Sequence, residues 1–114
     1  MNSKELGRYG EEVAVEYLQK QGYHIIERNF YIKQGEIDII AKKGDVLSFC
    51  EVKTRTSSDF GLPCEAVNLK KQAKIRQVAS IYIQTHCIDF ESITFDVIEV
   101  YFSEKRIEHL RNVF

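Results

Sequence analysis

The sequence predicts a single α/β domain in which helices flank a mixed central sheet. Two stretches carry apolar residues at helical spacing, and several short runs rich in β-branched and aromatic residues are typical of strands. The 114 residues contain no repeat, no low-complexity segment and no linker rich in Pro, Gly and Ser. One domain with one core is therefore expected to cover residues 1–114.

The first helix is predicted over residues 3–21. Its apolar positions recur every three or four residues, at Leu6, Gly10, Val13, Ala14, Tyr17 and Leu18. Asn2 or Ser3 can cap its start, and Gly22 can end it. A second long helix follows the capping residue Asn68 and carries one apolar face, made of Ile75, Val78, Ala79, Tyr82 and Ile83.

Strands are predicted over residues 23–30, 36–41, 46–53, 93–102 and 106–110. Residues 42–45 form a turn, and residues 54–64, rich in Thr, Ser, Asp, Gly and Pro, form a loop. The resulting order is αβββαβ with a short final strand. Such an order, with a helix crossing over between strands, is typical of an α/β sandwich.

The composition excludes several classes of protein. Three cysteines without CxxC spacing disfavour a disulfide framework or a zinc knuckle. No apolar run is long enough to span a bilayer, and the N-terminal residues do not resemble a signal peptide. We therefore expect a cytoplasmic protein without a membrane partner.

The charge is unevenly distributed. The net charge of −1 counts against indiscriminate binding of nucleic acid. Residues 53–76, however, hold six basic residues and two acidic ones, a local charge of +4. Such a basic patch can bind phosphates on a slightly acidic protein.

Three charged residues interrupt apolar strands and are the candidate catalytic residues. Asp38 stands between Ile37 and Ile39, and a lone ionised carboxylate there would need a cation. Glu51 and Lys53 share one face of the following strand, because side chains alternate across a strand. If the two strands are neighbours, all three side chains can converge.

Such a cluster fits a magnesium site. Mg²⁺ uses one or two carboxylates together with water and substrate phosphate, so Asp38 and Glu51 would suffice, and the carbonyl oxygen of Val52 could add a further ligand. Lys53 could orient the attacking water and stabilise charge on the phosphate. Glu11, at the edge of the apolar stripe of the first helix, could be a fourth member. The alternative is an ordinary surface ion pair between Glu51 and Lys53.

Four basic residues are candidates for nucleic-acid contact. Arg55 lies just beyond the cluster and is the better candidate for a phosphate contact. Lys70, Lys71 and Lys74 are expected on the solvated face of the second helix, where they could hold a phosphate backbone without reading sequence.

The cluster resembles the PD-(D/E)xK nuclease signature, in the form Asp38…Glu51-Val52-Lys53. More closely, the chain resembles the YraN family of predicted endonucleases. That family is similar to archaeal Holliday-junction resolvases, whose first helix carries Gly-x-x-x-Glu, spaced here as Gly7 and Glu11. The matching stretches are 7–11, 28–30, 35–38, 49–55, 60–61, 71–72 and 95–97.

The resemblance implies a restriction-endonuclease-like αβββαβ core. It implies metal ligation by Asp38 and Glu51, catalysis by Lys53, assistance by Glu11, and products with 5′-phosphate and 3′-hydroxyl ends. Two departures stand out: Ile37 occupies the Pro position of the signature, and Thr94 stands where relatives often have Arg. The loss of that Arg removes a potential phosphate contact.

The sequence thus favours an endonuclease that depends on Mg²⁺ or Mn²⁺ and acts on DNA, with branched or otherwise structured DNA as a candidate substrate. A nucleic-acid-binding module of the same fold without effective catalysis is the main alternative, and a scaffold with merely structural charges is a third. The resolvases act as dimers, so a homodimer is also open.

Overall fold

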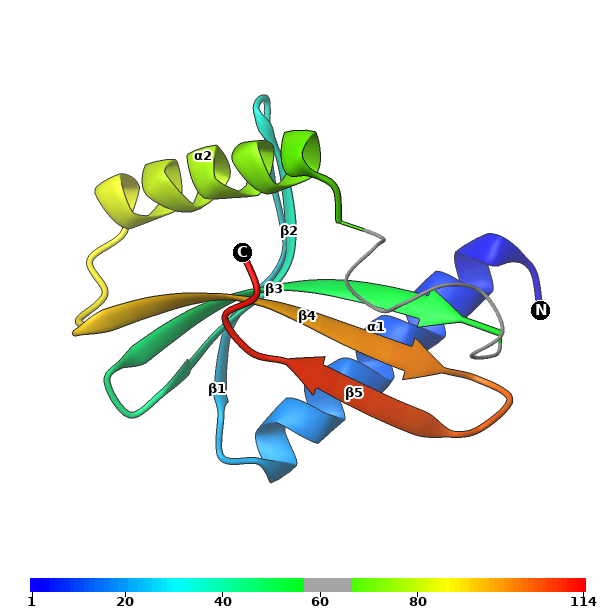
Figure 1. Cartoon of the computed structure of the whole chain (residues 1–114). Helices are drawn as coiled ribbons and strands as arrows, with labels where there is room; N and C mark the ends of the chain where they lie inside the picture. The colour runs from blue at the N-terminus through cyan, green and yellow to red at the C-terminus, as the bar shows by residue number, and fades with distance from the viewer. Residues whose placement is uncertain (57–66) are drawn as a thin grey trace.

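The computed structural model describes residues 1–56 and 67–114. Its elements run in the predicted order (Figure 1): α1 (Ser3–Lys20), β1 (His24–Ile32), β2 (Gly35–Lys43), β3 (Val46–Arg55), α2 (Leu69–Thr85), β4 (Ser92–Tyr101) and β5 (Arg106–Leu110). The predicted helix and strand ends agree within two residues. Residues 54 and 55 belong to β3 rather than to the predicted loop, whose remainder, with Phe60 and Gly61, lies almost wholly outside the described residues.

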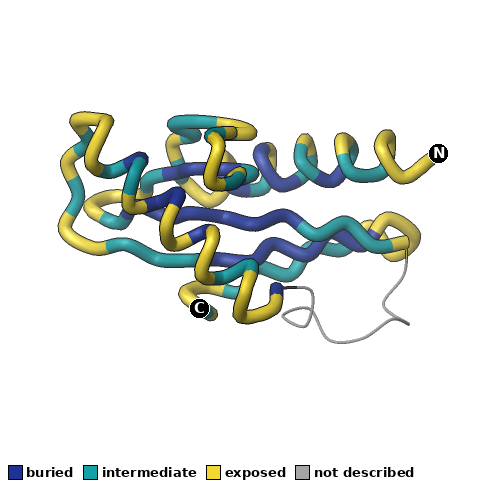
Figure 2. Tube along the Cα trace, turned by 90° about the horizontal axis from the view of Figure 1, so that it is seen from above, coloured by how far each residue is buried: buried dark blue, intermediate teal, exposed yellow. Residues whose placement is uncertain are grey.

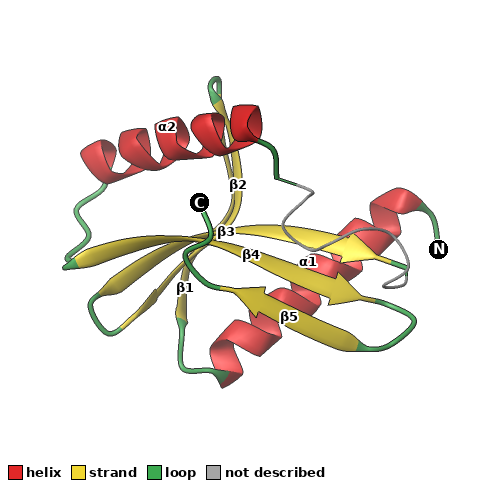
Figure 3. Cartoon of the chain, viewed as in Figure 1, coloured by secondary structure: helices red, strands yellow, loops and turns green. Residues whose placement is uncertain are grey.

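The five strands form one mixed sheet in sequence order, β1-β2-β3-β4-β5 (Figure 3). Strands β3 and β4 are parallel, and the other neighbouring pairs are antiparallel. A parallel pair cannot be joined by a tight turn, so α2 provides the crossover between them. The mixed α/β architecture expected from the sequence is therefore confirmed.

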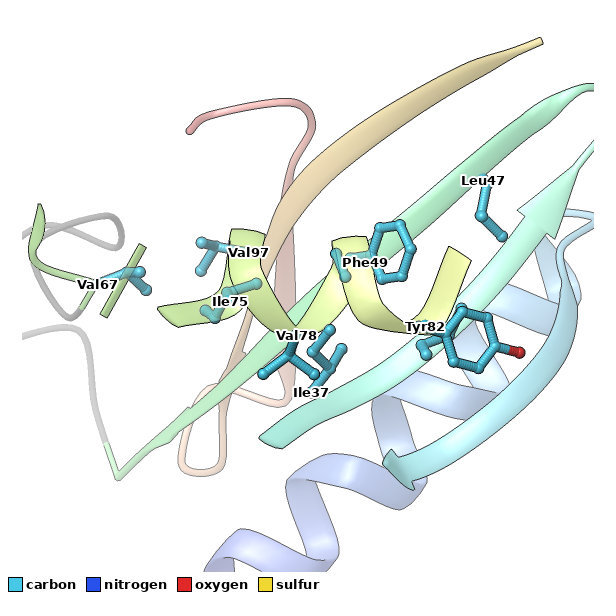
Figure 4. Packing of buried hydrophobic residues seen from close by; sticks show 10 residues of the cluster. Ile37, Leu47, Phe49, Val67, Ile75, Val78, Tyr82 and Val97 are labelled. Atoms are coloured by element: carbon cyan, nitrogen blue, oxygen red, sulfur yellow. The ribbon is translucent and has the colours of Figure 1, made fainter. Parts of the chain in front are cut away.

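The two helices cover opposite faces of the sheet, with α2 above it and α1 below it in Figure 1. Alternation along β3 sends Phe49 into the cluster under α2 and Cys50 into the cluster against α1. Figure 4 shows the α2 cluster, which includes Ile37, Phe49, Ile75, Val78 and Tyr82. Burial is concentrated along the central strands (Figure 2), so the sheet forms the middle layer of the molecule.

Local signals fix the start of both helices. The Asn2 side chain accepts a hydrogen bond from the Glu5 N–H at 2.9 Å, and the Glu5 side chain returns one to the Asn2 N–H, forming a capping box. Asn68 caps α2 in the same way through the Lys71 N–H, at 2.9 Å. Neither helix combines the length and apolar character needed to cross a membrane.

Helix α1 packs tightly against β3 at Gly10. A Cβ built on Gly10 would lie 1.7 Å from Thr54 Oγ1, so only glycine fits between the helix and this part of the strand. Gly7, by contrast, has no atom within 4 Å of such a Cβ. Glu11 follows Gly10 on the helix and Lys53 precedes Thr54 on the strand, so this approach joins the segments that carry both predicted site residues.

Strands β2 and β3 separate at Asp38. Within the described residues, their backbone pairing runs from Lys43↔Val46 to Ile39↔Cys50 and stops there. Beyond that point β2 bends toward α2 (Figure 1), and the Val52 N–H donates to Asp38 Oδ2 at 2.8 Å. The sheet thus opens into a fork whose two arms carry Asp38 and Glu51.

Candidate functional site

Asp38 and Glu51 meet at the fork, beside a pocket of about 230 Å³. Asp38 is half-buried, and Glu51 is only 6% exposed. The pocket lies between the two strands and α2 and is lined by Gly35, Glu36, Asp38, Glu51, Lys71, Lys74 and Ile75. Three acids and two lysines therefore face one small open space.

The charged form of Asp38 is destabilised by its surroundings. Burial raises the pKa of Asp38 to about 7, and the nearby charge of Glu51 adds to the increase. The Val52 N–H opposes this rise because it stabilises the charged form, whereas the charges of Glu11 and Glu36 reinforce it. The charged form of Asp38 is therefore unfavourable unless a positive charge lies beside it.

Two ammonium groups approach the same oxygen of Glu51. Lys71 Nζ lies 2.6 Å from Glu51 Oε1, and Lys53 Nζ lies 3.7 Å from it. Burial and the adjacent Lys71 lower the pKa of Lys53. Burial also disfavours the charged form of Lys71, but its hydrogen bonds with Glu51 and Lys53 outweigh this effect and raise its pKa.

The position of Lys71 differs from the expected solvated helix face. The side chain lies in the pocket and is partly buried, paired with Glu51. A sequence signal was present, because Lys71 precedes Ile75 by four residues and so shares the apolar stripe of α2. Lys70 and Lys74 are exposed as expected, with Lys74 lining the pocket and Lys70 outside it.

Glu11 influences the site only by its electrostatic effect on Asp38. It is half-buried on α1, and its charge contributes to the raised pKa of Asp38. Within residues 1–56 and 67–114, no hydrogen bond joins Glu11 to Asp38 or Glu51, and Glu11 does not line the pocket. Its assisting role therefore remains a prediction.

Arg55 is held by an acid that the sequence analysis missed. Its Nε lies 3.0 Å from Oε2 of Glu99, which is fully buried on β4. The other oxygen, Glu99 Oε1, has no hydrogen-bond partner in the described part of the chain. The available signal was the same as for Asp38, since Glu99 interrupts the apolar run 97–100.

The donor set fits a magnesium-like ion with few protein ligands. The described residues contain no cluster of three His, Cys, Asp or Glu side chains arranged to hold a metal. Asp38 and Glu51 alone satisfy the one or two carboxylates that Mg²⁺ typically takes from a protein. Val52 contributes its N–H to Asp38, and the role of its carbonyl oxygen as a ligand stays a prediction.

A larger pocket, of about 430 Å³, lies away from this chemistry. Thr94 lines this pocket, and Thr94 Oγ1 lies 2.7 Å from Ser48 Oγ. None of the predicted site residues lines this pocket. Its size alone therefore does not make it the candidate functional site, which is the smaller pocket at the fork.

Fold and site together define a mixed α/β protein with an acid–lysine cluster where two strands of its sheet diverge. The chain belongs to the uncharacterised protein family UPF0102, whose model matches residues 10–100. This match confirms the resemblance to the YraN family at the level of the family.

The chain is similar to UPF0102 proteins over their whole length. It is 54% identical over 114 residues to the one from Clostridioides difficile (strain 630), covering 100% of both chains. It is 45% identical over 118 residues to one from Dictyoglomus turgidum, again covering 100% of both. A relative from Alkaliphilus metalliredigens is 49% identical over 113 residues, covering 98% of this chain and 99% of the relative.

Proposed function

We propose that this protein is a metal-dependent endonuclease with a restriction-endonuclease-like core that hydrolyses phosphodiester bonds in DNA, with branched or structured DNA as a candidate substrate. The observation that carries the proposal is the convergence of Asp38, Glu51 and Lys53 at the fork between β2 and β3. The element order, in which αβββαβ precedes β5, supports it.

Asp38 and Glu51 would hold Mg²⁺ or Mn²⁺. A metal bound there supplies a Lewis acid and lowers the pKa of a coordinated water. Lys53 donates hydrogen bonds from its ammonium group to the attacking water or to a phosphoryl oxygen, which stabilises the negative charge that grows during in-line displacement. Val52 holds Asp38 in place through its N–H.

The nucleic acid would approach along α2. Lys74 lines the pocket and Lys70 is exposed nearby on the same helix, so both can meet phosphates of a backbone. These contacts carry no sequence information, which fits an enzyme that recognises shape rather than sequence. Arg55 is less available for this role because it is paired with Glu99.

The direct test is cleavage of a panel of four-way junctions, flaps, single strands and duplexes in the presence of Mg²⁺ or Mn²⁺. We expect wild type to cut at least one substrate, and Asp38→Asn and Lys53→Met to lose at least about 100-fold in rate. Asp89→Asn, at an exposed position after α2, is the matched control and should cut like wild type. Equal cutting by all variants would remove Asp38 and Lys53 from the mechanism.

One observation favours the alternative of a nucleic-acid-binding module without effective catalysis. Lys71 neutralises Glu51 at 2.6 Å, so this acid is satisfied without a metal. Binding to the same panel in chelator, with affinity that falls as salt rises, and no cleavage after metal is added would support this alternative. A scaffold would show no such affinity.

A further inference from the structure

We propose that Lys71 is the internal counter-ion of Glu51 and that it opposes the binding of a divalent cation at Asp38 and Glu51. This inference rests on the metal site of the proposed function. It gives Lys71 a role that differs from the backbone contact expected for the lysines of α2, because the site has a built-in competitor for its own metal.

The geometry gives Glu51 a strong partner. The Glu51 side chain is 7% exposed, and a carboxylate buried to this extent is costly unless it is paired. Lys71 Nζ lies at 2.6 Å, well inside the 3.7 Å that separates Lys53 Nζ from the same oxygen. Lys71 is therefore the main counter-ion, and Lys53 contributes a weaker interaction.

Helix α2 itself does not favour a cation at this position. Lys71 lies in the first turn of α2, where the helix dipole is positive, and this turn contains no acidic residue. The side chain nevertheless enters the pocket, while its N–H is bound to the capping Asn68 at 2.9 Å. Attraction to the acids at the fork therefore outweighs the unfavourable dipole.

A divalent cation at Asp38 and Glu51 would meet this positive charge. The cation and the Lys71 ammonium would compete for the negative charge of the same carboxylate and repel each other at short range. Removal of the ammonium should strengthen cation binding on the order of tenfold. This direction is opposite to the loss of metal affinity expected when a group that supports a metal ligand is removed.

The experiment is calorimetric titration of metal-free protein with Mn²⁺. Lys71→Met and Lys71→Gln are expected to bind Mn²⁺ about tenfold more tightly than wild type. The matched control is Lys70→Met, which removes the same charge from the adjacent exposed position and should change the Kd by less than about twofold, because exposed charges are screened. Asp38→Asn should weaken binding in either background.

The outcomes separate this inference from the proposed function. If wild type binds Mn²⁺ and the Lys71 variants match Lys70→Met, the counter-ion role is wrong while the metal site stands. If wild type and the Lys71 variants bind no Mn²⁺, both proposals fail. If only the Lys71 variants bind, the competition is stronger than expected and the inference holds.

Thermal unfolding gives a second readout that does not depend on activity. In chelator, Lys71→Met should melt below wild type, because Glu51 loses its counter-ion. Mn²⁺ should then raise the melting temperature of Lys71→Met by more than it raises that of wild type. A smaller rise in the variant would overturn the inference. Lys71→Gln, which can still donate a hydrogen bond to Glu51, covers the case in which the Met variant does not fold.

Discussion

Arg55 and Glu99 form an ion pair that joins the parallel strands β3 and β4 next to the candidate site. Arg55 Nε lies 3.0 Å from Glu99 Oε2, and Glu99 is paired in register with Lys53. Burial raises the pKa of Glu99, while the charges of Arg55 and Lys53 act against that rise. The pair therefore neutralises an acid that the sheet has enclosed.

Arg55→Met is expected to destabilise the protein by about 3 kcal/mol, because it leaves a buried carboxylate without its cation. Urea unfolding at neutral pH measures this change. The double variant Arg55→Met/Glu99→Leu should recover most of the loss, since an apolar pair can replace a buried ion pair. If the double variant is no more stable than Arg55→Met alone, Glu99 is not the source of the penalty.

Asp38 should make the metal-free protein less stable as the pH rises. The pKa of Asp38 is raised from 3.8 to about 7 on folding, so the folded state holds a proton that the unfolded state releases. The stabilisation is complete below pH 3.8 and is lost as the pH rises through about 7.

Asp38→Asn removes this titration and keeps an oxygen that can accept from the Val52 N–H. In chelator, the stability of Asp38→Asn relative to wild type should therefore increase between about pH 4 and pH 7 and then level off. Denaturant unfolding at a series of pH values measures the difference. A difference that does not vary with pH would mean that Asp38 titrates normally.

Gly10→Ala should be destabilising although it lies within a helix. The added methyl group would lie 1.7 Å from Thr54 Oγ1 and 2.8 Å from Thr54 Cβ, so the helix or the strand must shift, at a cost of about 1–3 kcal/mol. Gly7→Ala is the matched control on the same helix, because its methyl group meets no atom within 4 Å. We expect it to stabilise the protein by about 0.5–1 kcal/mol. Similar effects at both positions in thermal unfolding would contradict this packing.

Tyr17→Phe should cost about 1 kcal/mol of stability, because Tyr17 Oη lies 3.0 Å from His109 Nδ1 in a partly buried position. His109 Nε2 in turn lies 2.7 Å from Asp96 Oδ2, and the Asn112 N–H donates to Asp96 Oδ1 at 2.9 Å. Asp96→Ala should therefore cost more than Tyr17→Phe, since it leaves two partners unsatisfied. Chemical denaturation of both variants gives the comparison, and the reverse order would contradict it.

The periodicity of apolar residues is enough to predict the helices and strands. Helical spacing over residues 3–21, and the caps at Asn2 and Asn68, correspond to α1 and α2, because these signals depend only on residues close in the chain. Strand ends were predicted too short at Arg55 and Lys43, where polar side chains continue the backbone pairing. Backbone hydrogen bonds can extend a strand past the end of its apolar pattern.

The same sequence patterns predict only part of the candidate site. Asp38, Glu51 and Lys53 stood out because each interrupts an apolar strand. The proximity of Lys71 and the pairing of Arg55 with Glu99 depend on where α2 and β4 lie relative to β3. That arrangement is set by packing between distant segments, which local patterns do not specify.

The hydrogen bond at the fork also gives Asp38 a structural role in the sheet. Its carboxylate accepts the Val52 N–H at the point where backbone pairing between β2 and β3 ends. A side-chain oxygen here takes the place of a main-chain carbonyl as hydrogen-bond acceptor, so a residue of the candidate site also holds the two strands together. Substitutions that abolish the acceptor alter the shape of the sheet as well as its charge, and only a replacement of equal shape, such as Asn, tests the two separately.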